Sequence, residues 1–274
     1  MKTTSAIDAY DWSQIERVIV LSPHLDDAVL SAAGLLAALR GRVSRLVVTV
    51  ACGNPLPRNG ERRARHRKGF TSPTERRRED IEAMHDLDCD FVHLGFADCI
   101  YRRSPMTGDL IYEKARTKFA LCSPEDRAYV EELFLVLRRL SKNMGRVLVV
   151  APLGIGLHVD HIVVAQVALQ LVEPSHLLFY EDVPYVFNPR VGVGISDGPL
   201  AAMERLGCVP VHRLAISYEV STKSRLIRHY ESQIPLLFSK PDRLDEELSQ
   251  RAWKGTPAEF FWRAKPFNPK GRQK

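Results

Sequence analysis

Two short stretches of this sequence carry histidine and aspartate side chains at spacings that could hold a metal ion. In the first, His24, Asp26 and Asp27 follow a short apolar run, and in the second, the residues His-Val-Asp-His at 158–161 follow another. An apolar run before a helical pattern is typical of a buried strand, and open α/β sheets keep their sites beyond the carboxyl ends of such strands. Two strand ends that each offer histidine and aspartate therefore predict a metal site.

A catalytic zinc ion takes three nitrogen or oxygen ligands from the protein and leaves one position open for water. His24 and Asp27 lie three residues apart across a turn into a helix, close enough to face one ion. Spacing alone leaves both His158 and His161 available as the third ligand, and His161 would complete the site if the two strands are adjacent. Asp26 is beside a ligand without being needed as one, so it could accept a proton from the bound water.

Each motif also has an ordinary structural explanation. An Asp-Asp pair before a helix is more often a cap that complements the helix dipole, and a histidine after Gly-Ile-Gly is more often a plain loop residue. Because the two motifs occur together, after two separate apolar runs, we favour the metal site.

The hydrophobic pattern alternates between strands and helices, which predicts an α/β fold with a doubly wound, mostly parallel sheet. Strands are expected at 17–21, 46–50, 91–94, 147–151, 177–180 and 209–216. Helices are expected at 27–40, 74–87, 123–142, 161–172, 222–233 and 241–251. We expect a single domain over 1–274, with a core at about 15–187 and an embellished C-terminal extension at about 188–274.

The composition is that of an ordinary globular protein, with 45% hydrophobic residues, 26% charged residues and a formal charge of +6. The 5 cysteines include no Cys-x-x-Cys pair, which argues against a disulfide framework and a cysteine zinc ribbon. The N-terminal residues lack the apolar run of a signal peptide, and no stretch approaches the length of a membrane span. We therefore expect a cytoplasmic protein without a membrane span.

The two motifs together resemble the PIG-L/LmbE-like zinc-dependent N-deacetylases, which act on N-acetylglucosaminyl compounds. The signature of that family is Pro-His-x-Asp-Asp-Glu followed later by His-x-Asp-His; here the segments read Pro-His-Leu-Asp-Asp-Ala at 23–28 and His-Val-Asp-His at 158–161. The resemblance implies a Rossmann-like sheet. It also implies that His24, Asp27 and His161 bind zinc, one ion per chain.

The resemblance further implies roles for the remaining motif residues. Asp26 would be the general base, and His158 would polarise the amide carbonyl or stabilise the oxyanion, oriented by Asp160. The negative charge of Asp160 would favour a protonated imidazole. Ala28 stands where the family has glutamate, so a supporting contact near the site is lost, but we expect zinc binding to survive.

Other positions resemble substrate contacts of the family more faintly. Among the arginines at 76–78, Arg78 is the candidate for reaching the substrate, and Asp98 is the candidate for holding sugar hydroxyls. A solvated helix face and an ordinary loop aspartate are equally good explanations of these two. Glu181 and Tyr185, beyond the strand at 177–180, are the other candidate contacts.

A basic segment at 62–78 has three interpretations. A charge run is most often a solvated surface, which we favour, but the segment could also overhang the site and attract an anionic substrate. Nucleic-acid binding is the least favoured, because no aromatic residues or binding motif accompany the charges.

We therefore predict a zinc-dependent hydrolase that removes acetyl from an N-acetylglucosamine-type amino sugar or glycoconjugate. Within enzymes the alternative is an amidase that cleaves a larger acyl group. From another class, the alternative is a catalytically silent sugar-binding protein of the same fold, against which the intact motifs argue. The expected partner is an N-acetylated sugar or glycoconjugate, anionic ones included, with no nucleic acid, and the sequence is compatible with a homo-oligomer.

Overall fold

The computed structural model describes residues 3–5, 12–55, 71–114, 118, 121–142, 145–187, 198–238 and 241–267. The strands are β1 (Thr3–Ser5), β2 (Arg17–Ser22), β3 (Ser44–Ala51), β4 (Asp90–Phe96), β5 (Val147–Pro152), β6 (Leu177–Tyr180), β7 (Cys208–Ser217), β8 (Ala252–Trp253) and β9 (Thr256–Pro266). The α-helices are α1 (Asp27–Ala38), α2 (Pro73–Leu87), α4 (Arg127–Ser141), α5 (Val159–Leu171), α6 (Gly198–Arg205), α7 (Val220–Ile227), α8 (Ile234–Leu237) and α9 (Leu244–Ser249). Short 3-10 helices are η2 (Trp12–Gln14), η3 (Cys99–Tyr101), η4 (Pro124–Asp126), η5 (Pro174–His176) and η6 (Pro241–Arg243).

The strands stand in the order β1-β7-β9-β6-β5-β2-β3-β4, and β8 pairs with β9. β4, β3, β2, β5 and β6 are parallel neighbours, so the central sheet is mostly parallel, as predicted. β2 and β5, the strands that precede the two motifs, pair directly with Arg17 opposite Val147. The two strands are therefore adjacent, which is the condition under which His161 could complete the site.

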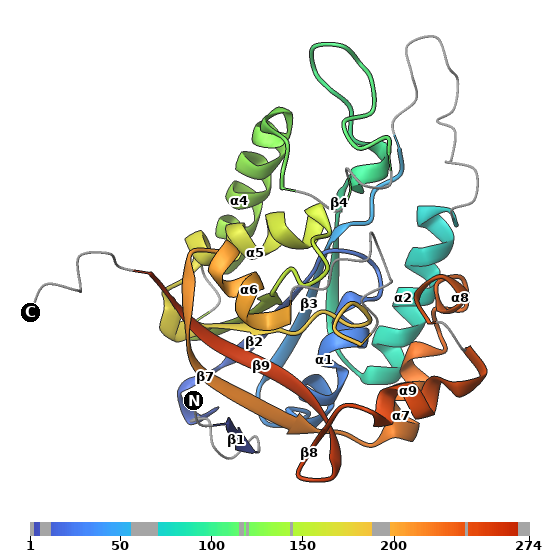
Figure 1. The fold of residues 1–274 in the computed structure, drawn as a ribbon, viewed down its shortest axis with the longest axis vertical. Helices are drawn as coiled ribbons and strands as arrows, with labels where there is room; N and C mark the ends of the chain where they lie inside the picture. Colours follow the sequence, from blue (N-terminus) through green and yellow to red (C-terminus); the bar gives the residue numbers. More distant parts are fainter. Residues whose placement is uncertain are drawn as a thin grey trace, which may run out of the picture.

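Side chains of the central strands alternate between two hydrophobic clusters. In β2, Val18 and Val20 pack in one cluster, whereas Ile19 and Leu21 pack in the other. Figure 1 shows α1, α2 and α7 on one side of the sheet and α4, α5 and α6 on the other. Because helices cover both faces, the central strands are apolar along their whole length rather than alternating with polar residues.

The C-terminal third extends the same sheet. β9 lies between β6 and β7 and runs antiparallel to both, while β1 pairs in parallel with β7 at the edge. The prediction of a strand at 209–216 agrees with β7. The sequence pattern does not predict β9, because Pro257, Glu259 and Arg263 interrupt its apolar residues.

The helix predicted at 222–233 is wrong in its extent. α7 ends at Ile227, and a turn follows before α8 begins at Ile234. In that turn, the Ser232 backbone N–H and hydroxyl both donate to the Glu79 carboxylate of α2, at 2.9 and 2.7 Å. This contact between distant segments holds residues 231–233 in a turn against α2.

Candidate active site

The site lies beyond the carboxyl ends of four parallel strands. The turn after β2 carries His24, Asp26 and Asp27, the loop after β4 carries Asp98, the segment after β5 carries His158, Asp160 and His161, and the exit from β6 carries Asp182. Ser22 closes the turn after β2, since its hydroxyl donates to the His24 carbonyl and accepts the Ala28 backbone N–H. Parallel strands end at one edge of the sheet, so these residues from four loops meet.

Asp27 lies between the two histidines that are predicted to share a metal ion with it. Its Oδ2 atom is 3.2 Å from His24 Nδ1 and 3.3 Å from His161 Nε2. The same oxygen accepts the His24 backbone N–H at 2.8 Å. All three residues are buried. The two motifs, far apart in the sequence, therefore form one compact group.

Three histidines near Asp27 form a donor set that fits a zinc ion. His24, His158 and His161 each offer a ring nitrogen within 4.8 Å of the others. Two further candidate groups combine one of these histidines with a nearby thiol or with nearby carboxylates. Among the described residues, the buried Nε2 of His161 has no hydrogen-bond partner, although it lies against Asp27. An unsatisfied nitrogen beside a carboxylate and a second imidazole matches the nitrogen and oxygen ligands that zinc prefers.

His158 differs from the other two histidines in its protonation. Its Nδ1 accepts the backbone N–H of Asp160 at 3.3 Å, which caps α5. Burial lowers the pKa of His158 well below its ordinary value, and the charge on His24 acts in the same direction. These surroundings favour the neutral imidazole of His158 over the protonated form that the resemblance implies. The neutral ring carries its hydrogen on Nε2, because Nδ1 is the acceptor.

The carboxylate of Asp160 bonds to groups other than His158. Its Oδ2 lies 3.0 Å from His24 Nε2 and accepts the Cys99 backbone N–H at 3.1 Å. Its Oδ1 pairs with the guanidinium of Arg102 at 2.5 Å. From His158 Nδ1 the carboxylate is 4.0 Å away.

Asp26 is buried next to the candidate metal-binding group of His24, Asp27 and His161, and it faces a different partner. Its Oδ2 lies 3.3 Å from the guanidinium of Arg76 in α2. Burial raises the pKa of Asp26 to about 6, and the positive charge of Arg76 works against that rise. A carboxylate with a pKa near neutrality is well matched to general base catalysis.

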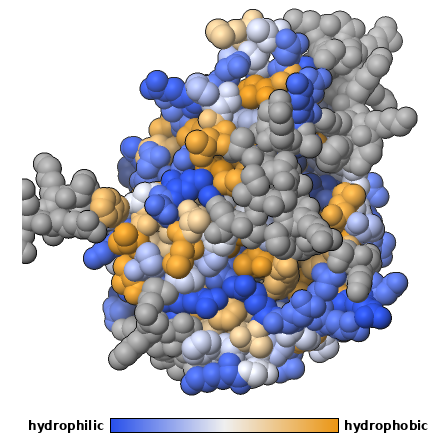
Figure 2. All heavy atoms as spheres, viewed as in Figure 1, coloured by the Kyte–Doolittle hydropathy of each residue, from blue (hydrophilic) through white to orange (hydrophobic). Residues whose placement is uncertain are grey.

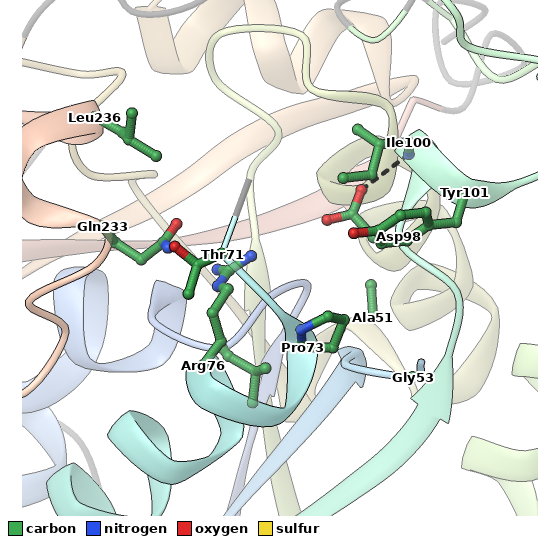
Figure 3. Close-up of a pocket in the computed structure, with 11 residues that line it drawn as sticks. Ala51, Gly53, Thr71, Pro73, Arg76, Asp98, Ile100, Tyr101, Gln233 and Leu236 are labelled. Atoms are coloured by element: carbon green, nitrogen blue, oxygen red, sulfur yellow. Dashed lines mark hydrogen bonds between the residues drawn. The ribbon is translucent and has the colours of Figure 1, made fainter. Parts of the chain in front are cut away.

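A small pocket with a cavity volume of about 30 Å³ adjoins the candidate metal-binding group. Figure 3 shows Arg76 and Gln233 on one side of it, with Asp98 and Tyr101 across from them. Asp98 accepts the Ile100 backbone N–H at 3.0 Å with Oδ1, while its Oδ2 lies 3.9 Å from His24. Charged, amide and aromatic side chains that converge on one concave site are suited to a small polar ligand.

The four predicted substrate contacts differ in whether they lie at the pocket. Asp98 lines the pocket, and the Tyr185 ring lies 5.5 Å from the ring of His161. Arg78 is on the exposed face of α2 and pairs with Glu82, whereas Arg76 is the arginine of this segment that lines the pocket.

Glu181 is also outside the pocket. Its carboxylate accepts the Trp262 indole N–H at 2.7 Å and pairs with Arg213 and Arg251. It therefore joins β6 to the C-terminal strands. The next residue, Asp182, points to the other side, as neighbours in an extended chain do, and contacts His161 at 2.7 Å.

Asp182, Arg102 and Gln233 are site residues that the sequence analysis missed. The rule that sites follow strand ends could have identified Asp182, because it comes two residues after β6. Arg102 and Gln233 reach the site through tertiary contacts, for which the sequence carries no local signal. The basic residues 62–68, with the role predicted for them, lie outside the described residues.

Comparisons with known proteins identify the family of this chain. The family model PIG-L, described as GlcNAc-PI de-N-acetylase, matches residues 19–172. The 2'-N-acetylparomamine deacetylase of Streptomyces fradiae is 32% identical over 251 residues, covering 88% of this chain and 80% of that protein. A teicoplanin deacetylase bound to teicoplanin has a TM-score of 0.71 at 27% identity, and its zinc-inhibited form has 0.73 at 26%. Both alignments cover 92% of this chain and 99% of the other.

None of the helices in the described part of the chain combines the length and apolar character that crossing a bilayer requires. Large exposed apolar side chains stand on separate elements, among them Met106, Leu200 and Leu236. On the face drawn in Figure 2, apolar residues form patches separated by hydrophilic ones. Single exposed apolar residues are normal and predict no interface by themselves.

Proposed function

Because this chain belongs to the PIG-L family of de-N-acetylases, we propose that it is a zinc-dependent hydrolase that removes acetyl from an N-acetylated amino sugar or its glycoconjugate. The relatives support a sugar-type substrate, since one is a deacetylase of acetylparomamine and another is bound to teicoplanin. The observation that carries the proposal is the position of Asp27 between His24 and His161, with buried Asp26 next to it.

His24, Asp27 and His161 would hold one zinc ion per chain. When bound, zinc supplies a Lewis acid for the amide carbonyl and lowers the pKa of a water molecule. The chain itself must then accept a proton, stabilise developing charge and hold the sugar.

Asp26 is the proposed proton acceptor. It lies beside Asp27 in the sequence but points to Arg76, which fixes one carboxylate oxygen at 3.3 Å. Its pKa of about 6 leaves the carboxylate largely ionised at neutral pH and still basic enough to take a proton from the attacking water. The same group can return the proton to the departing amine.

His158 is the proposed donor to the oxyanion. Because its Nδ1 accepts the Asp160 backbone N–H, its Nε2 carries the hydrogen that a developing negative charge requires. A donor that is already oriented before the reaction stabilises the transition state more than the ground state. A neutral imidazole performs this role without an additional charge in the buried site.

The pocket of Figure 3 is the proposed sugar site. Arg76, Asp98 and Gln233 can bind hydroxyl groups, and Tyr101 offers an aromatic face. Since Gln233 comes from the C-terminal extension, we propose that 1–274 acts as a single domain. The order β4-β3-β2-β5-β6 supports describing its core as Rossmann-like.

Acetate and free amine should be measured with the zinc-loaded protein on N-acetylglucosamine, 2'-N-acetylparomamine and an N-acetylated glycopeptide. We expect equal amounts of acetate and amine from at least one of them. A series of longer N-acyl groups on the preferred sugar tests the amidase alternative, which requires faster release of a longer chain. A zinc-loaded protein that binds these sugars and releases no acyl group would be a silent sugar-binding protein.

A further inference from the structure

Each of the two proposed histidine ligands has a buried carboxylate on the side of its ring that faces away from Asp27. Behind His24, Asp160 Oδ2 lies 3.0 Å from Nε2, whereas Nδ1 faces Asp27. Behind His161, Asp182 Oδ1 lies 2.7 Å from Nδ1, whereas Nε2 faces Asp27. The two rings therefore present opposite nitrogens to the same aspartate.

Both carboxylates are themselves held in place. Asp182 is fully buried, and its second oxygen accepts the Ile155 backbone N–H at 2.9 Å. Asp160 is 2% exposed, accepts the Cys99 N–H, and pairs through its second oxygen with Arg102. Such fixed acceptors determine which ring nitrogen of each histidine carries hydrogen.

We propose that Asp160 and Asp182 are positioning residues that fix the tautomers of the metal-binding histidines. His24 donates its Nε2–H to Asp160 and keeps the lone pair on Nδ1, while His161 donates its Nδ1–H to Asp182 and keeps the lone pair on Nε2. Both lone pairs then converge on the ion beside Asp27. The inference rests on the proposed function, because it assumes that His24 and His161 bind the metal.

This assignment gives Asp160 a different task from orienting His158. The Asp160 carboxylate is 4.0 Å from His158 Nδ1, beyond hydrogen-bonding distance. That nitrogen already accepts the Asp160 backbone N–H, so it has no hydrogen to offer the carboxylate. Backbone and side chain of one residue thus serve two different histidines.

The test is zinc affinity, measured by competition with a chromophoric chelator, for the parent, Asp160→Asn and Asp182→Asn. Partners of this kind on metal-bound histidines typically change metal affinity by about 10–100-fold, so we expect weakening on that scale in both variants. The visible absorption of the cobalt-substituted protein should change as well, because the ligand orientation relaxes. Melting of the metal-free proteins shows whether each variant is folded.

Asp126→Asn is the matched control for Asp160. Asp126 is equally buried at 2% exposure and also pairs with Arg102, at 3.0 Å, but its carboxylate bonds to Tyr112 instead of a histidine. Its zinc affinity should stay within a few-fold of the parent.

The outcomes separate this inference from the proposed function. If the parent binds zinc and both folded variants match it, the positioning role is refuted while the proposed function stands. If Asp160→Asn keeps the parent's zinc affinity and cobalt spectrum but loses kcat, Asp160 acts through His158 and the inference is wrong for it. A parent that takes up no zinc overturns both.

Discussion

At the residue scale, neighbouring aspartates in one turn have different surroundings. Asp27 faces two histidines, whereas Asp26 faces Arg76, and burial brings the pKa of Asp26 to about 6. Under the proposed function, this divergence would let one carboxylate bind zinc while the next accepts a proton. The sequence predicts the pair as a unit, because strand, turn and helix start are local features.

Asp26→Asn is the variant that isolates proton acceptance. The amide keeps the shape of the side chain but cannot take a proton, so kcat should fall on the order of 10²–10⁴. Zinc content should remain near that of the parent, because Asp26 is not one of the proposed zinc ligands. Activity within a few-fold of the parent would place the base elsewhere.

His158 and His161 are separated by three residues, and exchanging each for alanine distinguishes their roles. His158→Ala should keep zinc and lose kcat by roughly 10²–10³, the scale of one lost oxyanion donor. His161→Ala should lose zinc and activity together, because its Nε2 faces the ligand group. Metal analysis and kinetics on both variants provide the check. The reverse pattern would show that the two roles are exchanged.

At the element scale, α2 connects the site to the C-terminal extension. Its Glu79 binds Ser232, and its Asp80 accepts the Tyr230 hydroxyl at 2.7 Å, which together hold the turn that brings Gln233 to the pocket. The existence of α2 is predictable from sequence. The sequence does not predict which of the three consecutive arginines enters the pocket. Each step along a helix turns the side chain by about 100°, and tertiary contacts determine which face is packed.

The two faces of α2 can be tested with Arg76→Ala and Arg78→Ala. Arg76 lines the pocket, so its loss should raise KM or lower kcat/KM by roughly 10–100-fold, equivalent to one charge-assisted hydrogen bond. Arg78 is exposed and pairs only with Glu82 among the described residues, so its removal should leave the kinetics unchanged. Equal losses in the two variants would contradict this division.

Asp86 ties α2 to α7 through Arg225 and to the turn after α7 through His229, at 3.0 Å. Although burial acts to raise it, these partners lower the pKa of Asp86 below its ordinary value. An aspartate whose pKa is lower in the folded protein stabilises the fold at pH values above its pKa in the unfolded chain, which is about 4. This stabilisation is lost as the pH falls through the pKa of the folded state. Asp86→Asn should cost roughly 0.2–1 kcal/mol at pH 7 in urea unfolding. The difference from the parent should shrink below about pH 4. A difference of constant size down to lower pH would contradict the charge-based account.

At the scale of the whole molecule, one sheet carries the site and the extension that completes it. The five parallel strands and the helices between them are predictable, because apolar strand runs and helix patterns are local features of the sequence. The antiparallel strand β9 is not predictable in this way, because its register depends on β6 and β7, which lie far from it in the sequence. The sequence therefore predicts the ligand group, whereas the carboxylates behind it and the pocket walls require the assembled fold.

The measurement that tests the central claim most directly is acetate release from an N-acetylated amino sugar by one preparation before chelation, after chelation and after return of zinc. We predict release with an equal amount of free amine, its loss on chelation, and its recovery when about one zinc per chain is restored. Zinc should be added stepwise, since a zinc-inhibited form of the related teicoplanin deacetylase is known. Acetate release that continues unchanged in the metal-free, folded protein would contradict the account.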